Sequence, residues 1–395
     1  MVNVCVEKLK DSVDFGIYIH YPLCRRRCGY CDFATLRDPD FPHVAYTQRV
    51  LQEAEFRGEQ FKEWPLRSIY FGGGSPSLWA SREMAQVVAG LRSMFTIARD
   101  GVEVTVECNP QDVGRRELAG FVEAGINRLS VGAQSFDDEM LHRLTREHDT
   151  KRTRRCIMDA RKVGFENLSI DLIYGLRGQD TDHHLEQLEQ LLAFTPEHVS
   201  VYALTLAAEA PLRKAGEGVV DDDASAGMLL ATVDFLGTAG YAHYEVSNFA
   251  QEGRTSAHNE GVWRGRPYLG LGANAHSMLW NQGRNVRCAN PESSRYMNAP
   301  MQRSAPMFHV RGAELEELST GASRHEMLML GMRTRRGVKE SEYEARFGGT
   351  MDAHFGAALN QLQAEGLLRK DQGAWCPSTH GMFFADAVAL RLASP

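Results

Sequence analysis

Strand-like apolar runs alternate with helix-like stretches from residue 17 to residue 246, and this order constrains the fold most. The runs are rich in Val, Ile and Tyr, which is typical of strands buried on both faces. A strand–helix–strand order predicts parallel strands joined by crossover helices. Six or seven such units favour an α/β fold with a partial (β/α)6 barrel of the TIM type, whose functional side chains lie at the carboxyl ends of the strands. We expect strands at 17–20, 68–71, 102–107, 128–131, 168–173, 198–204 and 243–246. We expect helices at 44–61, 82–94, 115–123, 152–163, 184–193 and 224–236.

The pattern changes after about residue 300, where an irregular connector precedes a second group of elements. Apolar spacing predicts helices at 323–333, 340–346 and 351–365, followed by a hairpin and a final helix. Three helices and a hairpin resemble a winged-helix module. Lys and Arg are not concentrated on its third helix, so a packing or lid role is favoured and no nucleic-acid partner is expected. We predict two domains, a barrel of residues 1–300 and an α+β winged-helix-like cap of residues 301–395.

Composition narrows the class of protein. The 395 residues include 44 Lys and Arg against 51 Asp and Glu, and the net charge of −7 argues against non-specific nucleic-acid binding. No run of about 18 apolar residues is present, so no transmembrane helix is expected. Residues 1–16 lack the apolar stretch of a secretory signal. We therefore expect a cytoplasmic protein, a setting in which disulfides are rare.

Three of the eight cysteines crowd into one loop directly after the first predicted strand, as Cys24-x3-Cys28-x2-Cys31. Buried thiols would be the simplest interpretation, but the neighbouring arginines, glycine and aspartate are not core residues. A structural zinc ion usually needs paired cysteines and a fourth ligand nearby. Three thiolates on a tight loop favour a 4Fe-4S cluster, with one iron open to a small chelating molecule. The adjacent arginines would stabilise the thiolates.

This spacing at the end of a first barrel strand resembles the radical S-adenosylmethionine (SAM) superfamily. In that superfamily the amino and carboxylate groups of SAM chelate the open iron, and one electron cleaves SAM to methionine and a 5′-deoxyadenosyl radical. The segment from Tyr18 to Cys24, with FGGGSPS, VECNP, INRLSVGAQSF and HYEVSNFA, is similar to the oxygen-independent coproporphyrinogen III oxidase family, which includes HemW-type heme chaperones. The resemblance covers nearly the whole chain and implies an electron donor of the flavodoxin or ferredoxin type.

Glycine and polar residues follow the predicted strands, where SAM would bind. The glycines of FGGGSPS allow close backbone approach to a ligand, and a carboxylate such as Glu107 can accept hydrogen bonds from an ammonium or hydroxyl group. In the oxidase branch two SAM molecules occupy the site. The resemblance implies contacts with the cluster-bound SAM from Tyr18, Gly73 and Glu107. It implies contacts with a second SAM, whose binding here is a hypothesis, from Tyr30, Gly74, Ser75, Gln134, Arg146 and Asp171.

Two motifs distinguish the branches of this family. The oxidases carry a fourth cysteine two residues after the third, where this chain has Phe33, and this ending resembles the HemW branch. HemW-type proteins also carry a His-Asn-x-x-Tyr-Trp motif associated with heme; here His258 and Trp263 match it, but Val262 replaces the tyrosine. A neutral imidazole can ligate heme iron, so His258 is a candidate heme ligand, although a single histidine is more often an ordinary polar residue. Arg177 is a further departure, because relatives usually have Leu-Pro-Gly there.

Three functions fit these residues, and none yields an assigned catalytic residue. The preferred hypothesis is a HemW-like carrier that binds heme and passes it to respiratory or other hemoproteins, with at most peripheral contact with membrane-bound acceptors. The second is a class C radical SAM methyltransferase or cyclopropane-forming enzyme of secondary metabolism, which uses the second SAM as carbon donor. The third is coproporphyrinogen III oxidase itself, against which Phe33 counts. All three bind and cleave SAM.

Overall fold

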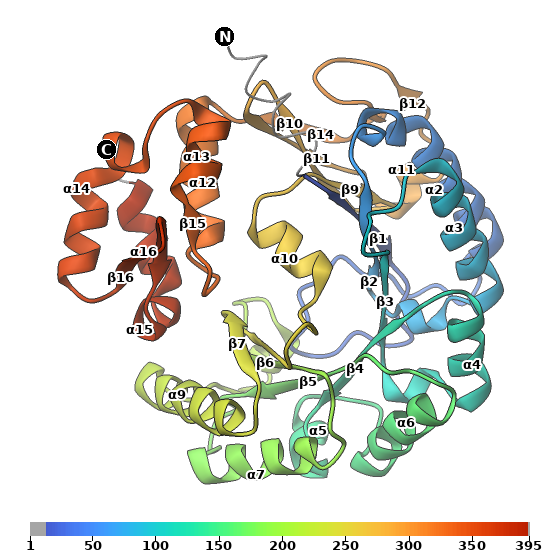
Figure 1. The fold of residues 1–395 in the computed structure, drawn as a ribbon. Helices are drawn as coiled ribbons and strands as arrows, with labels where there is room; N and C mark the ends of the chain where they lie inside the picture. Colours follow the sequence, from blue (N-terminus) through green and yellow to red (C-terminus); the bar gives the residue numbers. More distant parts are fainter. Residues whose placement is uncertain (1–12, 394–395) are drawn as a thin grey trace.

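Six parallel strands form the centre of the computed structural model, which describes residues 13–393 (Figure 1). Of residues 1–16, which lack the apolar stretch of a secretory signal, residues 1–12 lie outside this range. The strands follow one another in chain order, so the predicted partial barrel is confirmed. They are β1 (Phe15–Tyr21), β2 (Leu66–Gly73), β3 (Glu103–Cys108), β4 (Arg128–Gln134), β5 (Leu168–Tyr174) and β6 (His198–Ala203).

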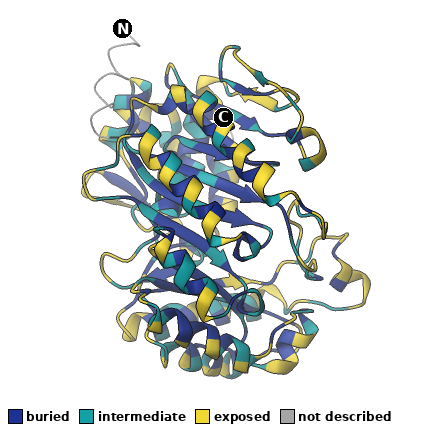
Figure 2. Ribbon diagram, turned by 90° about the vertical axis from the view of Figure 1, so that its right-hand side faces the viewer, coloured by how far each residue is buried: buried dark blue, intermediate teal, exposed yellow. Residues whose placement is uncertain are grey.

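Helices cover the outer face of these strands, and their exposed sides appear in yellow in Figure 2. On β1 the outward residues Phe15, Ile17 and Ile19 are at most 1% exposed, whereas Tyr18 and His20 point to the interior of the barrel, as strand alternation requires. The interior is therefore lined by polar side chains. The outer helices are α2 (His43–Gly58), α3 (Ser81–Met94), α4 (Arg115–Glu123), α5 (Asp138–Arg143), α6 (Thr150–Lys162), α7 (Thr181–Leu192) and α9 (Asp222–Thr238).

The sheet continues beyond the six parallel strands at both ends, to twelve strands in all among the described residues. Beside β1 lie β9 (Tyr268–Leu271), β10 (His276–Asn281), β11 (Arg284–Ala289) and β14 (Glu314–Glu317). Beside β6 lies β8 (Asn248–Ala250) and then β7 (Ala242–Glu245), both antiparallel to their neighbours. The strand expected at 243–246 is present as β7 and runs in the same direction as β6, but it does not pair with β6, because the antiparallel β8 lies between them. Two residues connect β7 to β8, which suits a hairpin and not a crossover.

A short helix, α10 (Ala257–Trp263), lies inside the ring of strands (Figure 1). Its N-terminus is fixed twice. The Ser256 hydroxyl accepts a hydrogen bond from the Asn259 amide, and the Glu103 carboxylate of β3 accepts from the amides of Ala257 and His258. A carboxylate at a helix N-terminus is favourable for the helix dipole. The helix thus closes the barrel interior at the amino ends of β1–β3.

A buried ion pair joins α2 to the strands added beside β1. Arg57 is fully buried and donates to Glu53 at 2.6 Å, to the Gly270 carbonyl at 3.0 Å and to the Ser277 hydroxyl at 2.8 Å. Glu53 also accepts from the Tyr296 hydroxyl at 2.7 Å. These bonds fasten β9 and β10 behind β1.

The C-terminal elements include the three helices, the hairpin and the final helix that the sequence predicts, as in a winged helix. A short strand that was not predicted, β15, joins the hairpin in a sheet of order β15-β17-β16. They have their own apolar core. The boundary at residue 300 stays a prediction. The elements are α12 (Thr320–Gly331), β15 (Val338–Lys339), α13 (Glu340–Phe347), α14 (Met351–Ala364), β16 (Leu368–Asp371), β17 (Ala374–Pro377), α15 (Thr379–Phe383) and α16 (Ala385–Ala393). Shorter connecting elements are α8 (Pro211–Lys214), α11 (Ser293–Tyr296), β12 (Met301–Gln302) and β13 (His309–Val310).

This module bridges the gap between the two ends of the sheet (Figure 1). On one side the Val246 amide donates to the Arg333 carbonyl and the Arg335 amide donates to the Tyr244 carbonyl, both at 3.0 Å. On the other side the buried guanidinium of Arg346 lies 4.4 Å from the centre of the Trp280 ring. Across residues 13–393, no helix has the length and apolar composition needed to span a membrane.

Candidate cofactor site at the carboxyl ends of the strands

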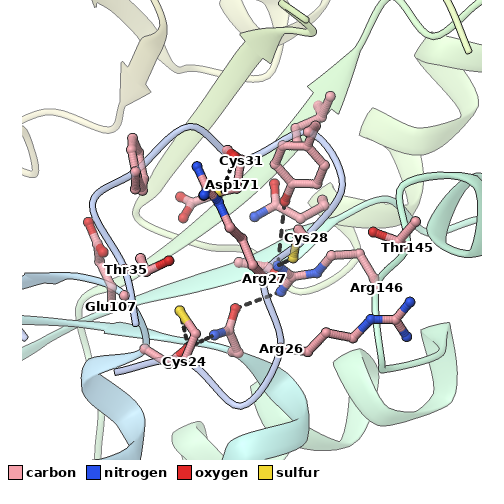
Figure 3. Close-up of a pocket in the computed structure, with 18 of the residues that line it drawn as sticks. Cys24, Arg26, Arg27, Cys28, Cys31, Thr35, Glu107, Thr145, Arg146 and Asp171 are labelled. Atoms are coloured by element: carbon pink, nitrogen blue, oxygen red, sulfur yellow. Dashed lines mark hydrogen bonds between the residues drawn. The ribbon is translucent and has the colours of Figure 1, made fainter. Parts of the chain in front are cut away.

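A cavity of about 630 Å³ lies at the carboxyl ends of β1–β6, where the strand pattern places functional residues (Figure 3). The structure brings all but two of the predicted site residues to its walls. Those present are Cys24, Cys28, Tyr30, Cys31, Gly73, Gly74, Ser75, Glu107, Gln134, Arg146 and Asp171. The two that do not line it are Tyr18 and His258.

The cysteine loop is fastened to the turn after β2 by its backbone. The Gly74 amide donates to the Tyr21 carbonyl at 2.7 Å, and the Ser75 amide donates to the Leu23 carbonyl at 2.8 Å. A Cβ atom on Gly74 would lie 2.6 Å from the Leu23 carbonyl oxygen, and Gly73 has a φ of +109°. Both positions therefore require glycine, which lets the loop cross directly over the turn.

Tyr18 is linked to the cysteine loop by hydrogen bonds through His20, a residue that sequence analysis did not single out. The His20 Nε2 atom lies 3.0 Å from the Ala34 carbonyl oxygen, and Nδ1 lies 3.2 Å from the Tyr18 hydroxyl. Because a carbonyl only accepts, Nε2 carries the proton and Nδ1 accepts from Tyr18. Burial lowers the pKa of His20, which keeps the ring neutral. The sequence feature that could have identified His20 is the alternation of side chains along β1, which places it on the same face as Tyr18.

The donor set fits an iron–sulfur cluster. The three thiols of the loop are free, half-buried and directed to one cavity. The Arg146 guanidinium lies 3.3 Å from the Cys28 sulfur, and the Ser75 hydroxyl lies 3.6 Å from the Cys24 sulfur. A cation and a hydroxyl beside cysteine sulfurs favour the thiolate form that ligates metal. Within residues 13–393 no group of three or more His, Cys, Asp or Glu side chains is arranged to hold a single metal ion.

Asn109 connects the side chains of one cavity wall. In the sequence it appears only as part of the VECNP motif and is not a predicted site residue. Its amide nitrogen donates to the Ser75 hydroxyl at 2.9 Å, and its amide oxygen accepts from Arg146 at 2.6 Å. Arg146 also reaches the Tyr30 hydroxyl at 3.4 Å. Gln134, at the end of β4, has a φ of +66°, where the register with β5 shifts. This left-handed turn directs the end of β4 to the cavity.

Asp171 ends a hydrogen-bond chain that runs through the barrel interior. It accepts from the hydroxyls of Ser130 and Ser169, both at 3.1 Å. Ser169 lies 2.8 Å from Nδ1 of His198, and Nε2 of His198 lies 2.8 Å from the Tyr244 hydroxyl. If Ser169 donates to the carboxylate, His198 must donate from Nδ1 and accept from Tyr244. Every donor in this hydrogen-bond chain then points toward Asp171, and the chain holds the Asp171 carboxylate in place.

His258 lies behind a tyrosine layer, away from the cavity. It is 8% exposed, its Nδ1 atom is 3.1 Å from the Ser68 hydroxyl, and its ring stacks on Tyr70 with 5.0 Å between centres. The Tyr70 hydroxyl in turn donates to Glu107 at 3.0 Å, on the cavity side. Burial lowers the pKa of His258 to about 4, so its imidazole is neutral. In this arrangement Tyr70 separates the imidazole from any ligand in the cavity.

Comparison with known proteins agrees with this geometry. Residues 18–192 match the Radical SAM superfamily, and residues 322–384 match the HemN C-terminal domain. The mitochondrial radical S-adenosyl methionine domain-containing protein 1 of Bos taurus is 32% identical, over 96% of this chain and 87% of that protein. The heme chaperone HemW of Lactococcus lactis is 30% identical, over 90% of this chain and 91% of that protein.

The chain belongs to the HemN/HemW family of radical SAM proteins. The resemblance seen in the sequence is thereby confirmed. The solved structure of coproporphyrinogen III oxidase (HemN) from Escherichia coli has the same fold, with a TM-score of 0.78 at 20% identity over 97% of this chain and 90% of that chain. Membership of the radical SAM superfamily implies a 4Fe-4S cluster and SAM as cofactors.

Proposed function

We propose that this HemN/HemW-family chain is a heme chaperone that also binds and cleaves SAM. The observation that carries the proposal is the three-cysteine cavity with Phe33, 60% exposed at its edge, in the position of the oxidases' fourth cysteine. Relatives at about 30% identity that bear the name heme chaperone HemW support it. A flavodoxin- or ferredoxin-type protein is the proposed electron donor.

We assign roles to the cavity residues on this basis. Cys24, Cys28 and Cys31 ligate the cluster, which when bound supplies one electron to SAM. Gly73 and Glu107 receive the cluster-bound SAM, and Tyr18 acts through the cysteine loop. A second SAM, if present, would lie against Tyr30, Gly74, Ser75, Gln134, Arg146 and Asp171. Arg146 is half-buried with its guanidinium 3.3 Å from the Cys28 sulfur, and it offsets the negative charge of cluster and thiolates.

Anaerobic reconstitution followed by heme titration tests the proposal. We expect a shifted Soret band on addition of heme, and release of methionine and 5′-deoxyadenosine from SAM that differs with and without heme. Failure to bind heme would contradict the chaperone assignment. Formation of S-adenosylhomocysteine would indicate the methyltransferase alternative, and decarboxylation of coproporphyrinogen III would indicate the oxidase.

The affinity for SAM should rise with pH through the titration of Glu107. Burial raises the pKa of this carboxyl to about 7, so it is mostly neutral below that pH and ionised above it. The ionised form attracts the ammonium group of SAM, and each pH unit below 7 is expected to weaken binding by up to about tenfold. A Glu107→Gln variant should bind weakly without this dependence. Equilibrium binding of SAM between pH 5.5 and 8 checks it, and equal pH slopes in both proteins would refute it.

A further inference from the structure

The wall of the cavity includes two aromatic and two basic side chains that the roles assigned above do not use. Phe33, Arg26 and Arg27 come from the cysteine loop, while Tyr202 comes from the end of β6; all four line the cavity. We call these four residues the rim. Figure 3 shows Arg26 and Arg27 on the same loop as the three cysteines.

The apolar part of the rim exposes an unusual amount of aromatic surface. Phe33 is 60% exposed and Tyr202 is 42% exposed, and both belong to the few large apolar side chains exposed among residues 13–393. No aromatic ring pairs with either of them in that part of the chain. Single exposed apolar residues are ordinary, but two in the wall of one cavity indicate a surface that a ligand covers. Aromatic rings favour a flat apolar ligand face.

The basic part of the rim has free hydrogen-bond donors. Arg25 is engaged, because its Nε atom lies 3.1 Å from the Asp112 carboxylate. The Nε atom of Arg27 donates to the Cys31 carbonyl at 3.1 Å, and its two terminal nitrogens have no hydrogen-bond partner among residues 13–393. Arg26 has no hydrogen-bond or ion-pair partner in the described part of the chain and is exposed. Guanidinium groups bind carboxylates with paired hydrogen bonds, so the rim suits an anionic ligand.

We infer that the rim is where the porphyrin of heme binds, with its face against Phe33 and Tyr202 and its carboxylates on Arg26 and Arg27. This inference rests on the proposed function and deepens it. It also accounts for the position of His258, which Tyr70 separates from the cavity. Recognition by ring face and carboxylates does not require iron, so affinity comes from the porphyrin itself.

Iron-free protoporphyrin IX and its dimethyl ester are the probes that test this. The reconstituted protein should bind the free acid, and absorbance titration should give a dissociation constant at least about tenfold higher for the ester, which lacks ionised carboxylates. Arg26→Gln/Arg27→Gln should raise the constant for the free acid by a similar factor and leave the ester unaffected. Phe33→Ala should weaken both probes. Arg116→Gln, at a side chain 95% exposed on α4, is the charge-matched control and should bind as the parent does.

The outcomes separate this inference from the proposed function. If heme binds but iron-free protoporphyrin does not, or if His258→Ala abolishes heme binding while the rim variants retain it, the rim assignment is overturned and the chaperone proposal stands. If neither heme nor protoporphyrin binds, both fail. The single variant Arg26→Gln guards against an effect of Arg27 on the cysteine loop, because Arg26 has no hydrogen-bond or ion-pair partner among residues 13–393. Unchanged binding of the free acid in both arginine variants would contradict the inference.

Discussion

A Cys28→Ala variant is expected to lose its cluster and its SAM cleavage together. The loop supplies only three thiols, and the remaining lining cysteine, Cys108, is 3% exposed with its sulfur directed to the Asn109 carbonyl, so it cannot replace the lost ligand. The substitution also removes a partner of the half-buried Arg146 guanidinium. We expect at least a thousandfold loss of cleavage rate, equivalent to about 4 kcal/mol of activation free energy.

Iron and sulfide per chain after anaerobic reconstitution, together with 5′-deoxyadenosine release, measure this effect. Cys376→Ala is the matched control, because this thiol lies in the winged-helix-like module and bonds only to the Arg336 carbonyl among described residues. The control should keep the iron content and activity of the parent. Full iron and activity in Cys28→Ala would contradict the assignment of the cysteine loop.

Arg57→Leu should give the largest loss of stability. The guanidinium is fully buried and its removal leaves the Glu53 carboxylate in the core without its cation. Breaking one side of such a pair costs about 3–5 kcal/mol. Because the same bonds hold β9 against α2 and β1, the variant should also bind its cluster less completely.

Urea denaturation of the parent and the variant measures the change in the free energy of unfolding. Glu53→Leu/Arg57→Leu should cost less than the sum of the two single changes, since it removes both charges. Arg116→Leu, at an exposed position, should change stability by at most about 0.5 kcal/mol. Additive single effects, or a loss below about 1 kcal/mol for Arg57→Leu, would show that the pair is not a stabilising unit.

The strands β1–β6 were predictable because each is a short run rich in Val, Ile, Leu or Tyr that a helix follows along the chain. The positions of the strands added at the two ends of these six were not predictable. β9 pairs parallel with β1, but it reads Tyr-Leu-Gly-Leu, is only four residues long, and its place depends on the distant Arg57 network. β7 reads as a strand, but nothing in its own sequence distinguishes a hairpin partner from a barrel strand.

The cavity residues were predictable because they follow strand ends, where the barrel brings them together. His258 shows the limit of that reasoning. Its motif points to a ligand, yet whether an imidazole faces a cavity depends on which side of Tyr70 the α10 helix packs. His20 is the converse case: it lies within a recognised motif, but its role becomes evident only from its distance to the Ala34 carbonyl.

The winged-helix-like module also changes the exposure of the sheet to other chains. β7 is the last strand at its end of the twelve-stranded sheet, and an uncovered last strand is a template for pairing between molecules. The bonds to Arg333 and Arg335 occupy the backbone groups of Tyr244 and Val246, so the module acts as a permanent shield against such association. The winged-helix-like module therefore does two things: it bridges the two ends of the barrel sheet, and it protects the edge strand β7 from aggregation.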